Sequence, residues 1–324
     1  MKKLLVYLFL LISVCACSTT KEETLDNVVD NQEDFSKLSI VAPTGAPSLG
    51  FLNYIDSPTF ETNSTVNNIL SMMTSTSSKQ VVVIDTISGI KAINKGAPYK
   101  LAANLTFGNF YIASCGNDNN SIMDKGDRIV LFGQGTTPDV VFHYLYGDEF
   151  DDGIEYVAAV SDAGKCLAVG KNFETGNEVN YVFIAEPILT TILNNKEAPT
   201  YSKAGIYANI QDLYKDKTGN NMIQASMFVK SDGSIKDIDN FYSYFSNNIN
   251  SILTDPSYVE TLLENKSDEE VSSIYGIKPA MIKNVLTKNT VGLGFIKAYD
   301  NKESIDEFIS LFNLEKTNEE IYFK

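Results

Sequence analysis

The sequence predicts an α/β fold in two lobes. Short apolar segments rich in β-branched residues alternate with helical segments over most of the 324 residues. This alternation is typical of mainly parallel sheets with helices on both faces. The expected strands are 38–41, 80–84, 101–105, 111–114, 129–132, 156–160, 181–184 and 225–229. The expected helices are 49–54, 67–73, 86–94, 140–146, 186–194 and 303–313, and the chain is expected to be mostly helical from 235 onwards.

The length of the chain suits two ordinary domains. A second run of strands and helices begins near Arg128, and the strand at 225–229 is expected to rejoin the first sheet. We therefore expect a first lobe at 38–126, a second lobe at 127–222, and a return to the first lobe with C-terminal helices at 223–324.

The N-terminus has the features of an export signal. Two lysines precede an apolar run (4–12) that is too short to span a membrane. The following Val14-Cys15-Ala16-Cys17 resembles the lipobox of bacterial lipoproteins, with Cys17 as the lipidated residue. We expect a signal peptide at 1–16 and a lipid-anchored protein on the outer side of the cell membrane. The alternative is an ordinary signal peptide cut near Ala16.

The mature protein is expected to be acidic. Residues 17–37 are polar and acidic without sustained periodicity, which is typical of a flexible tether. The whole chain has a formal net charge of −15. That charge argues against binding nucleic acid and against lying flat on anionic lipid. We interpret the acidity as solubility of an exported protein, and we expect a monomer.

Scarce residue types limit the possible chemistry. His143 is the only histidine, so zinc sites with two or three histidines are excluded. Arg128 is the only arginine, so a clamp of several arginines for an anion is unavailable. We expect neither a metal nor a cofactor. Cys115 and Cys166 could form a disulfide in an exported protein, but free thiols are favoured because the two are expected in different lobes.

Two loops follow the first strand of each expected lobe and precede a helix. They are 43–48 (Pro-Thr-Gly-Ala-Pro-Ser) and 133–138 (Gly-Gln-Gly-Thr-Thr-Pro). Free backbone N–H groups and the positive end of the helix dipole lie at such positions, and glycine lets a ligand approach closely. Open α/β sheets bind ligands at the carboxyl ends of their strands. The two loops together therefore indicate a binding site.

Four short motifs, in their order and spacing, resemble the extracytoplasmic substrate-binding proteins of ABC importers. The group concerned binds alkanesulfonates, taurine, nitrate and thiamine-precursor pyrimidines, and the resemblance covers about 38–310. The motifs are Ala42-Pro43-Thr44-Gly45-Ala46-Pro47-Ser48, Val82-Val83-Ile84-Asp85-Thr86, Gly135-Thr136-Thr137-Pro138-Asp139 and Phe183-Ile184-Ala185-Glu186-Pro187. The Ala-Glu-Pro turn is the most specific of them.

The resemblance implies a periplasmic-binding-protein-like fold of type II, in which two crossover strands join the lobes and the lobes close on a ligand. The ligand contacts that it implies are Gly45, Ala46, Ser48, Asp85, Thr86, Thr106, Asn109, Gly135, Thr136, Thr137 and Glu186. Two of these have a structural alternative. Asp85 can cap the helix 86–94, and Glu186 can place a favourable charge at a helix N-terminus.

The function implied is that of a solute-binding lipoprotein. It would deliver a sulfonate-, nitrate- or pyrimidine-like solute to the permease and ATPase subunits of an ABC importer, without catalysis. The single Arg128, with Asp85 and Glu186 near the cleft, favours a neutral or weakly cationic heterocycle over a strong anion. The alternatives are a surface sensor or adhesin lipoprotein, or an exported hydrolase that uses Asp85 and Glu186 as an acid/base pair.

Overall fold

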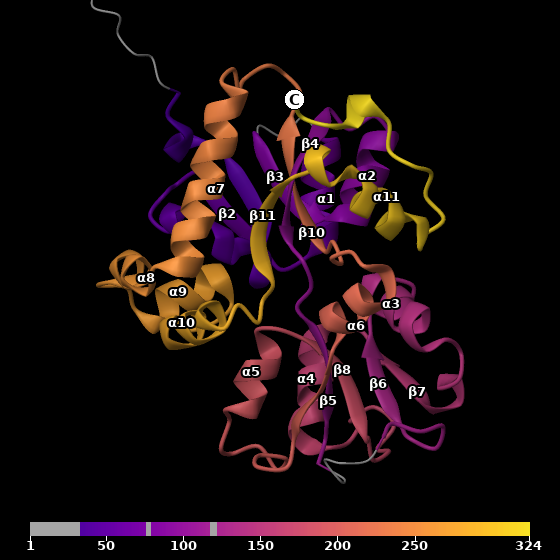
Figure 1. The fold of residues 1–324 in the computed structure, drawn as a ribbon. Helices are drawn as coiled ribbons and strands as arrows, with labels where there is room; N and C mark the ends of the chain where they lie inside the picture. Colours follow the sequence, from indigo (N-terminus) through magenta and orange to yellow (C-terminus); the bar gives the residue numbers. More distant parts are fainter. Residues whose placement is uncertain (1–32, 76–78, 117–121) are drawn as a thin grey trace, which may run out of the picture. The chain divides into compact units, whose positions relative to one another are not determined.

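Two mixed β-sheets organise the part of the chain that the computed structural model describes, which is residues 33–75, 79–116 and 122–324 (Figure 1). The first sheet, in the order β11-β4-β10-β3-β1-β2, consists of β1 (Ile40–Pro43), β2 (Phe60–Asn63), β3 (Val81–Asp85), β4 (Tyr99–Thr106), β10 (Ala225–Lys230) and β11 (Leu293–Lys297). The second, in the order β7-β6-β8-β5-β9, consists of β5 (Phe110–Ser114), β6 (Ile129–Phe132), β7 (Ile154–Val157), β8 (Tyr181–Ala185) and β9 (Gly205–Asn209).

Most strands within each sheet run the same way. In the first sheet β10 and β11 run antiparallel to the other strands, and in the second only β5 does.

The α-helices are α1 (Val66–Thr74), α2 (Thr86–Asn94), α3 (Thr137–Tyr146), α4 (Val160–Val169), α5 (Ile188–Leu193), α6 (Ile210–Thr218), α7 (Ile238–Thr254), α8 (Pro256–Leu263), α9 (Asp268–Tyr275), α10 (Pro279–Thr287) and α11 (Lys302–Ser310). Short 3₁₀-helices occupy η1 (Phe35–Lys37), η2 (Ala46–Tyr54), η3 (Asp151–Gly153), η4 (Tyr299–Asn301) and η5 (Glu319–Ile321).

Local sequence explains where several helices begin and end. Asp237 and Ser267 accept backbone N–H groups of the first turns of α7 and α9 with their side chains. Gly219 and Gly276 follow α6 and α9 in the left-handed conformation that glycine favours. None of the helices in the described residues is both long enough and apolar enough to cross a membrane.

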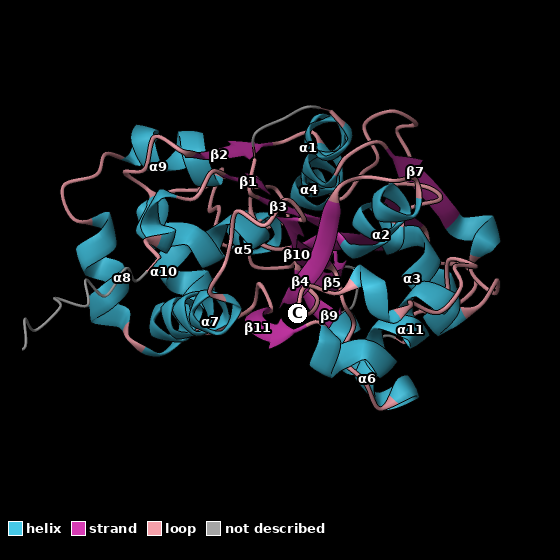
Figure 2. Ribbon diagram, turned by 90° about the horizontal axis from the view of Figure 1, so that it is seen from above, coloured by secondary structure: helices cyan, strands magenta, loops and turns pink. Residues whose placement is uncertain are grey.

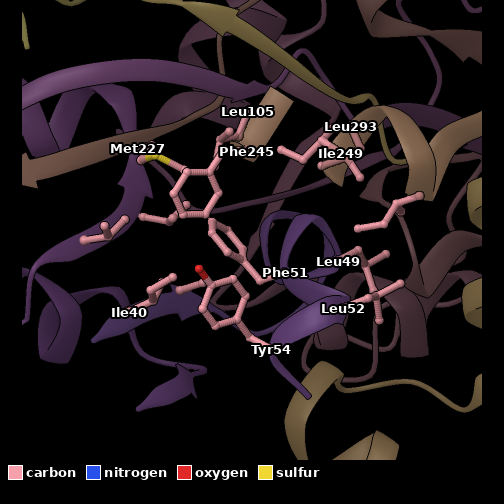
Figure 3. Close-up of a cluster of buried hydrophobic side chains, with 14 of the residues drawn as sticks. Ile40, Leu49, Phe51, Leu52, Tyr54, Leu105, Met227, Phe245, Ile249 and Leu293 are labelled. Carbon is pink, nitrogen blue, oxygen red and sulfur yellow. The ribbon is translucent and has the colours of Figure 1, made fainter. Parts of the chain in front are cut away.

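Helices cover both faces of the first sheet (Figure 2). On one face η2 and α7 pack against the strands, and Phe51, Phe245, Ile249 and Met227 meet there in a close-packed cluster (Figure 3). The buried residues of α1, α2 and α11 pack against the other face. The expectation of an α/β fold with helices on both faces is confirmed.

One hydrophobic cluster continues from the first sheet into the second. It contains buried residues of α2 and α11 together with residues of β6, α3 and α6. The rings of Tyr214 on α6 and Phe308 on α11 lie 6.0 Å apart between centroids. The side-chain amide of Asn220 bonds the Glu307 carboxylate, and Ser304 Oγ donates to Asn220 Oδ1 at 3.1 Å. This α6–α11 side therefore joins the two lobes firmly.

The strand predictions fail mainly at sheet edges. The edge strand β2 is only partly buried and carries Glu61, Thr62 and Asn63, so it shows no apolar run. The edge strand β9 has only the short apolar stretch 205–208, whose central two residues are exposed. β11 lies in the C-terminal region that was expected to be mostly helical. The expected strand 156–160 stops at Val157, because Val160 belongs to a helical pattern with the buried Ala163 and Leu167 in α4.

Other differences concern element boundaries. The expected helix 186–194 starts later, at Ile188. The domain boundary expected at 126 placed β5 in the first lobe, whereas β5 pairs with β8 and β9 in the second sheet.

The expectation of a flexible tether over 17–37 is wrong at its C-terminal end. Phe35 is 2% exposed and packs edge-on against Phe241 at 5.7 Å. Tyr54 donates its hydroxyl to the Phe35 carbonyl, and Glu33 Oε2 accepts the N–H of Lys236 at 3.1 Å. Burial of an aromatic ring outweighs the polar composition around it. The expected signal peptide at 1–16, Cys17 and the rest of the tether lie outside the described residues.

Replacing Phe35 by alanine should therefore destabilise the folded body. Loss of a buried aromatic ring costs about 3–5 kcal/mol. Phe173→Ala is the matched control because that ring is 50% exposed. Chemical denaturation should show a large decrease in the free energy of unfolding for Phe35→Ala and little change for Phe173→Ala. Equal, small effects would mean that residues 33–37 do not contribute to the fold.

Candidate functional site

The connection between β4 and β5 fixes where a site can lie. β4 ends at Thr106 on the edge of the first sheet where β3 also ends, since Asp85 and Thr106 both pair with Ala225. β5 starts at Phe110, opposite the end of β8 at Ala185. Four Cα steps reach at most about 14 Å. The carboxyl ends of the parallel strands in both sheets must therefore face each other.

The loop after β1 meets the turn after β8 at this junction. A Cβ atom placed on Gly45 would lie 3.9 Å from Pro187 Cδ. Gly45 has φ of 108°, a conformation that favours glycine. Of the predicted ligand residues, Gly45 and Glu186 are thus brought to opposite sides of one junction. The Glu186–Pro187 peptide bond is cis.

Other predicted residues of the first loop are bound within it. Ser48 is buried, and its hydroxyl donates to the Gly45 carbonyl at 2.8 Å. Ala46 is buried beside it. These contacts hold the loop in shape. In this structure the Ser48 hydroxyl therefore donates its hydrogen bond within the loop.

Asp85 takes the capping role that was left open in the sequence analysis. Its Oδ1 accepts the Ser88 N–H at 2.9 Å at the start of α2. Burial raises the pKa of the Asp85 carboxyl, although the hydrogen bonds from Ser88 oppose that effect.

Thr86 and Thr106 are fully buried and form hydrogen bonds with the second crossover, the segment that leads from α6 into β10. Thr86 Oγ1 lies 2.6 Å from Ser226 Oγ. Thr106 Oγ1 accepts the Ala225 N–H at 3.0 Å. The N–H of Thr86 donates to the Gln224 carbonyl at 2.9 Å. Both predicted residues therefore serve the backbone that links the lobes.

Asn109 and Glu186 face each other across the end of the second sheet. Asn109 Nδ2 donates to the Glu186 carbonyl at 2.8 Å, and the Glu186 N–H donates to the Asn109 carbonyl at 2.9 Å. Glu186 is buried, and its carboxylate accepts both the N–H and the hydroxyl of Thr190, at 2.9 and 2.6 Å. The helix-terminal role of Glu186 is thus present here as well.

The loop before α3 is more open than the first loop. Gly135 and Thr136 are exposed, and Thr137 is half-buried. Thr136 Oγ1 donates to the Gly133 carbonyl. The Gly135 N–H is already bound, because it donates to Asp139 Oδ2 at 2.7 Å. The protein's own carboxylate therefore occupies a donor that an anionic ligand would seek.

His143 stands behind that loop in a network of acids. Its Nδ1 lies 3.1 Å from Asp139 Oδ1, and its Nε2 lies 3.2 Å from Asp151 Oδ1. Partial burial acts to lower the pKa of His143, but its bonds to Asp139 and Asp151 and their charges outweigh it, so the pKa is raised. The ligand atoms of His143, Asp148 and Asp151 all lie within 4.8 Å of one another.

Arg128 and the cysteines lie away from the junction. Arg128 precedes β6, at the opposite end of that strand from the loop, and its Nη1 lies 3.2 Å from Glu155 Oε1. Cys115 and Cys166 are free and buried in one cluster of the second lobe, so the expectation of different lobes was wrong. Burial, and then the nearby Cys166, raise the pKa of Cys115 to about 12.

A groove of about 680 Å³ lies elsewhere, on the first lobe beside the C-terminus. Lys236 and Lys297 line it with Tyr242, Tyr299 and Lys324. Lys236 follows β10 and Lys297 ends β11, and both strands run against the other strands of the sheet. The groove therefore opens at the edge of the first sheet that lies opposite the junction.

Contacts between distant parts of the chain complete the junction, and the sequence did not predict them. Tyr111 donates its hydroxyl to the Thr290 carbonyl at 2.9 Å, which links the second lobe to the segment before β11. The Phe107 N–H donates to the Gly292 carbonyl at 2.8 Å. A Cβ atom on Gly292 would lie 2.2 Å from the Gly108 carbonyl oxygen, so only glycine fits there. No local pattern connects positions so far apart in the chain.

Several solved structures share this arrangement. An ABC transporter protein from Parabacteroides distasonis matches with a TM-score of 0.69 and 15% identity, over 89% of this chain and 99% of that one. The periplasmic aliphatic sulphonate binding protein of Escherichia coli matches with a TM-score of 0.59 and 13% identity, over 89% and 92%. The chain has the fold of ABC-transporter binding proteins.

A zinc-bound ligand-binding component of an ABC-type import system from Staphylococcus aureus has the same fold, with a TM-score of 0.56 and 11% identity over 89% of this chain and 96% of that one. No protein-family model and no curated protein matches the sequence. The expected resemblance to ABC-importer binding proteins is thus confirmed in fold.

The raised pKa of His143 predicts a pH-dependent contribution to stability. A histidine with a raised folded-state pKa stabilises fully below its usual value of 6.5. That contribution disappears as the pH rises through the folded-state pKa. The wild type should exceed His143→Gln in stability by about 0.2–1 kcal/mol near pH 5.5 and lose this advantage near pH 8.5. Denaturation of both proteins at the two pH values tests this, and a pH-independent difference would contradict it.

Proposed function

We propose that this protein is an extracytoplasmic solute-binding lipoprotein of an ABC importer. It traps a small organic solute between its lobes and delivers the solute to a permease, which an ATPase subunit drives. It acts as a monomer held to the cell membrane by acyl chains on Cys17, and it catalyses no reaction.

The observation that carries this proposal is the junction itself. The carboxyl ends of the strands of both sheets face each other, and the loop at Gly45 meets Pro187 there. Ligands bind at such strand ends in open α/β folds. The ligand contacts proposed at this junction are those inferred from the sequence, with Tyr111 and Thr290 added. The named structural neighbours include a sulphonate binding protein and a ligand-binding component of an import system.

The hydrogen bonds of Asp85 and Glu186 favour a binding function over a hydrolytic one. Asp85 caps α2, and Glu186 is bound to Thr190. An acid/base pair would need carboxylates that are free to exchange protons with a substrate. A sensor or adhesin would keep the same solute chemistry and would differ only in having no permease partner.

A thermal-shift screen of sulfonates, nitrate, pyrimidines, thiamine and flavins should identify a solute that stabilises the protein. Stabilisation should reach about 2.7 kcal/mol when the solute is at 100 times its Kd. Replacing Thr136 and Thr137 together by alanine should weaken binding without unfolding the protein. Thr254→Ala, an exposed hydroxyl at the end of α7, is the control. Absence of any stabilising solute would refute solute trapping.

The lipid anchor has its own test. Cys17→Ala should release the exported protein from the membrane, because the proposed acyl chains are attached to that cysteine. Cys15→Ala is the matched control and should stay in the membrane fraction. Retention of the Cys17→Ala variant would place the anchor elsewhere or replace it by an uncleaved signal.

A further inference from the structure

Buried polar atoms without a partner are concentrated at the junction of the lobes. Among the described residues, four buried side-chain atoms have no hydrogen-bond partner: Asn109 Oδ1, Gln224 Oε1, Ser234 Oγ and Thr290 Oγ1. Asn109 belongs to the first crossover and Gln224 to the second. Thr290 lies in the segment that bonds to the first crossover through Gly292. Because buried polar atoms are nearly always paired, this concentration calls for a cause.

The orientation of the Asn109 amide is fixed by its own hydrogen bond. Nδ2 faces the Glu186 carbonyl at 2.8 Å, and only the donor end of an amide can face a carbonyl. Oδ1 is therefore the orphaned end, and it is an acceptor. The residue is only 5% exposed. A buried acceptor without a donor costs about 1–3 kcal/mol.

Thr290 lies at the same junction as Asn109. Asn109 immediately precedes β5 and continues its pairing with β8, because the Glu186 N–H donates to the Asn109 carbonyl. The Tyr111 hydroxyl reaches the Thr290 carbonyl at 2.9 Å. Pro187, which follows the partner of Asn109, faces the Gly45 loop. Asn109 and Thr290 therefore both belong to the junction of the lobes.

The charges around this region are those of acids. Burial, followed by the charges of Glu186 and Asp212, raises the pKa of Tyr111 to about 12. The Gly135 N–H is taken by Asp139, and Arg128 is paired with Glu155. The protein offers acceptors here and keeps its backbone donor and its arginine engaged elsewhere.

We propose that the solute is an uncharged or cationic molecule with N–H donors, and that it is held by Asn109 Oδ1 and Thr290 Oγ1. This inference rests on the proposed function, and it deepens it by naming the class of solute. Closure over such a solute pairs both orphaned atoms. A nitrate ion or a simple alkanesulfonate has no donor to offer Asn109 Oδ1 and can only accept from the Thr290 hydroxyl.

Thr290→Val separates this role from a structural one. Valine keeps the shape and removes the orphaned atom, so the solute-free protein should be equally stable or more stable. Affinity for the solute should fall about 5- to 30-fold. Two controls should leave affinity unchanged. Ser234→Ala removes an orphaned atom outside the junction, and Thr287→Val removes an exposed hydroxyl near the end of α10.

The probes are ethanesulfonate and nitrate on one side, and cytosine, ethanolamine and thiamine on the other, each titrated calorimetrically into wild type and variants. Binding of an N–H-bearing probe, weakened by Thr290→Val and by neither control, supports the inference. Binding of ethanesulfonate or nitrate alone, or an affinity unmoved by Thr290→Val, overturns it and leaves solute trapping intact. Binding of no probe in this set or in the wider screen overturns both.

Discussion

The short first crossover is the constraint on which the rest of the structure depends. Only residues 107–109 separate the end of β4 from the start of β5. Both strands reach this point at the edges where the parallel strands of their sheets end, so the edges at which open α/β sheets bind ligands must face each other. Gly108 and Gly292 allow the segment before β11 to lie directly against this crossover.

The two sides of the junction differ in chemistry. On the α6–α11 side, a continuous hydrophobic cluster and the bonds of Asn220 join the lobes. On the other side, the Tyr111 hydroxyl donates to the Thr290 carbonyl, and the Gly45 loop approaches Pro187. Apolar contacts are lost when surfaces separate, whereas polar groups regain hydrogen bonds with water. We therefore expect the lobes to open on the side of the Tyr111–Thr290 bond and to pivot on the α6–α11 side.

We expect the same difference to make closure of the lobes depend on the proposed solute. A closed, empty junction leaves the acceptor of Asn109 and the hydroxyl of Thr290 unpaired. Opening exposes such atoms to water, and a suitable solute pairs them without opening. A solute with this differential affinity shifts the population to the closed state. The polar atoms thus oppose closure of the empty protein and favour closure of the loaded one.

The sequence was informative where local signals agree. A run of β-branched residues predicted β3. Asp85 before α2, and Lys95 and Gly96 after it, predicted where that helix begins and ends. It was uninformative for β2, whose edge position removes the apolar pattern, and the apolar stretch 205–208 of β9 is too short to indicate a strand by itself. The strand-end loops were predictable from their glycines and position.

The residues that complete the site could not be predicted in this way. The bond between Tyr111 and Thr290 joins positions 179 residues apart and depends on the topology of both lobes. The same holds for Cys115 and Cys166. They share a lobe because β5 joins the second sheet.

Distances between spin labels across the junction test the central claim most directly. Labels at Ser64→Cys after β2 and Gln134→Cys after β6, both exposed, report on the facing strand ends away from the crossovers. Labels at Asp216→Cys and Glu303→Cys, exposed on α6 and α11, report on the apolar side. On adding the most stabilising solute, the first distance should shorten and narrow while the second stays fixed. An unchanged first distance, or equal changes in both, would contradict a junction that closes on its solute.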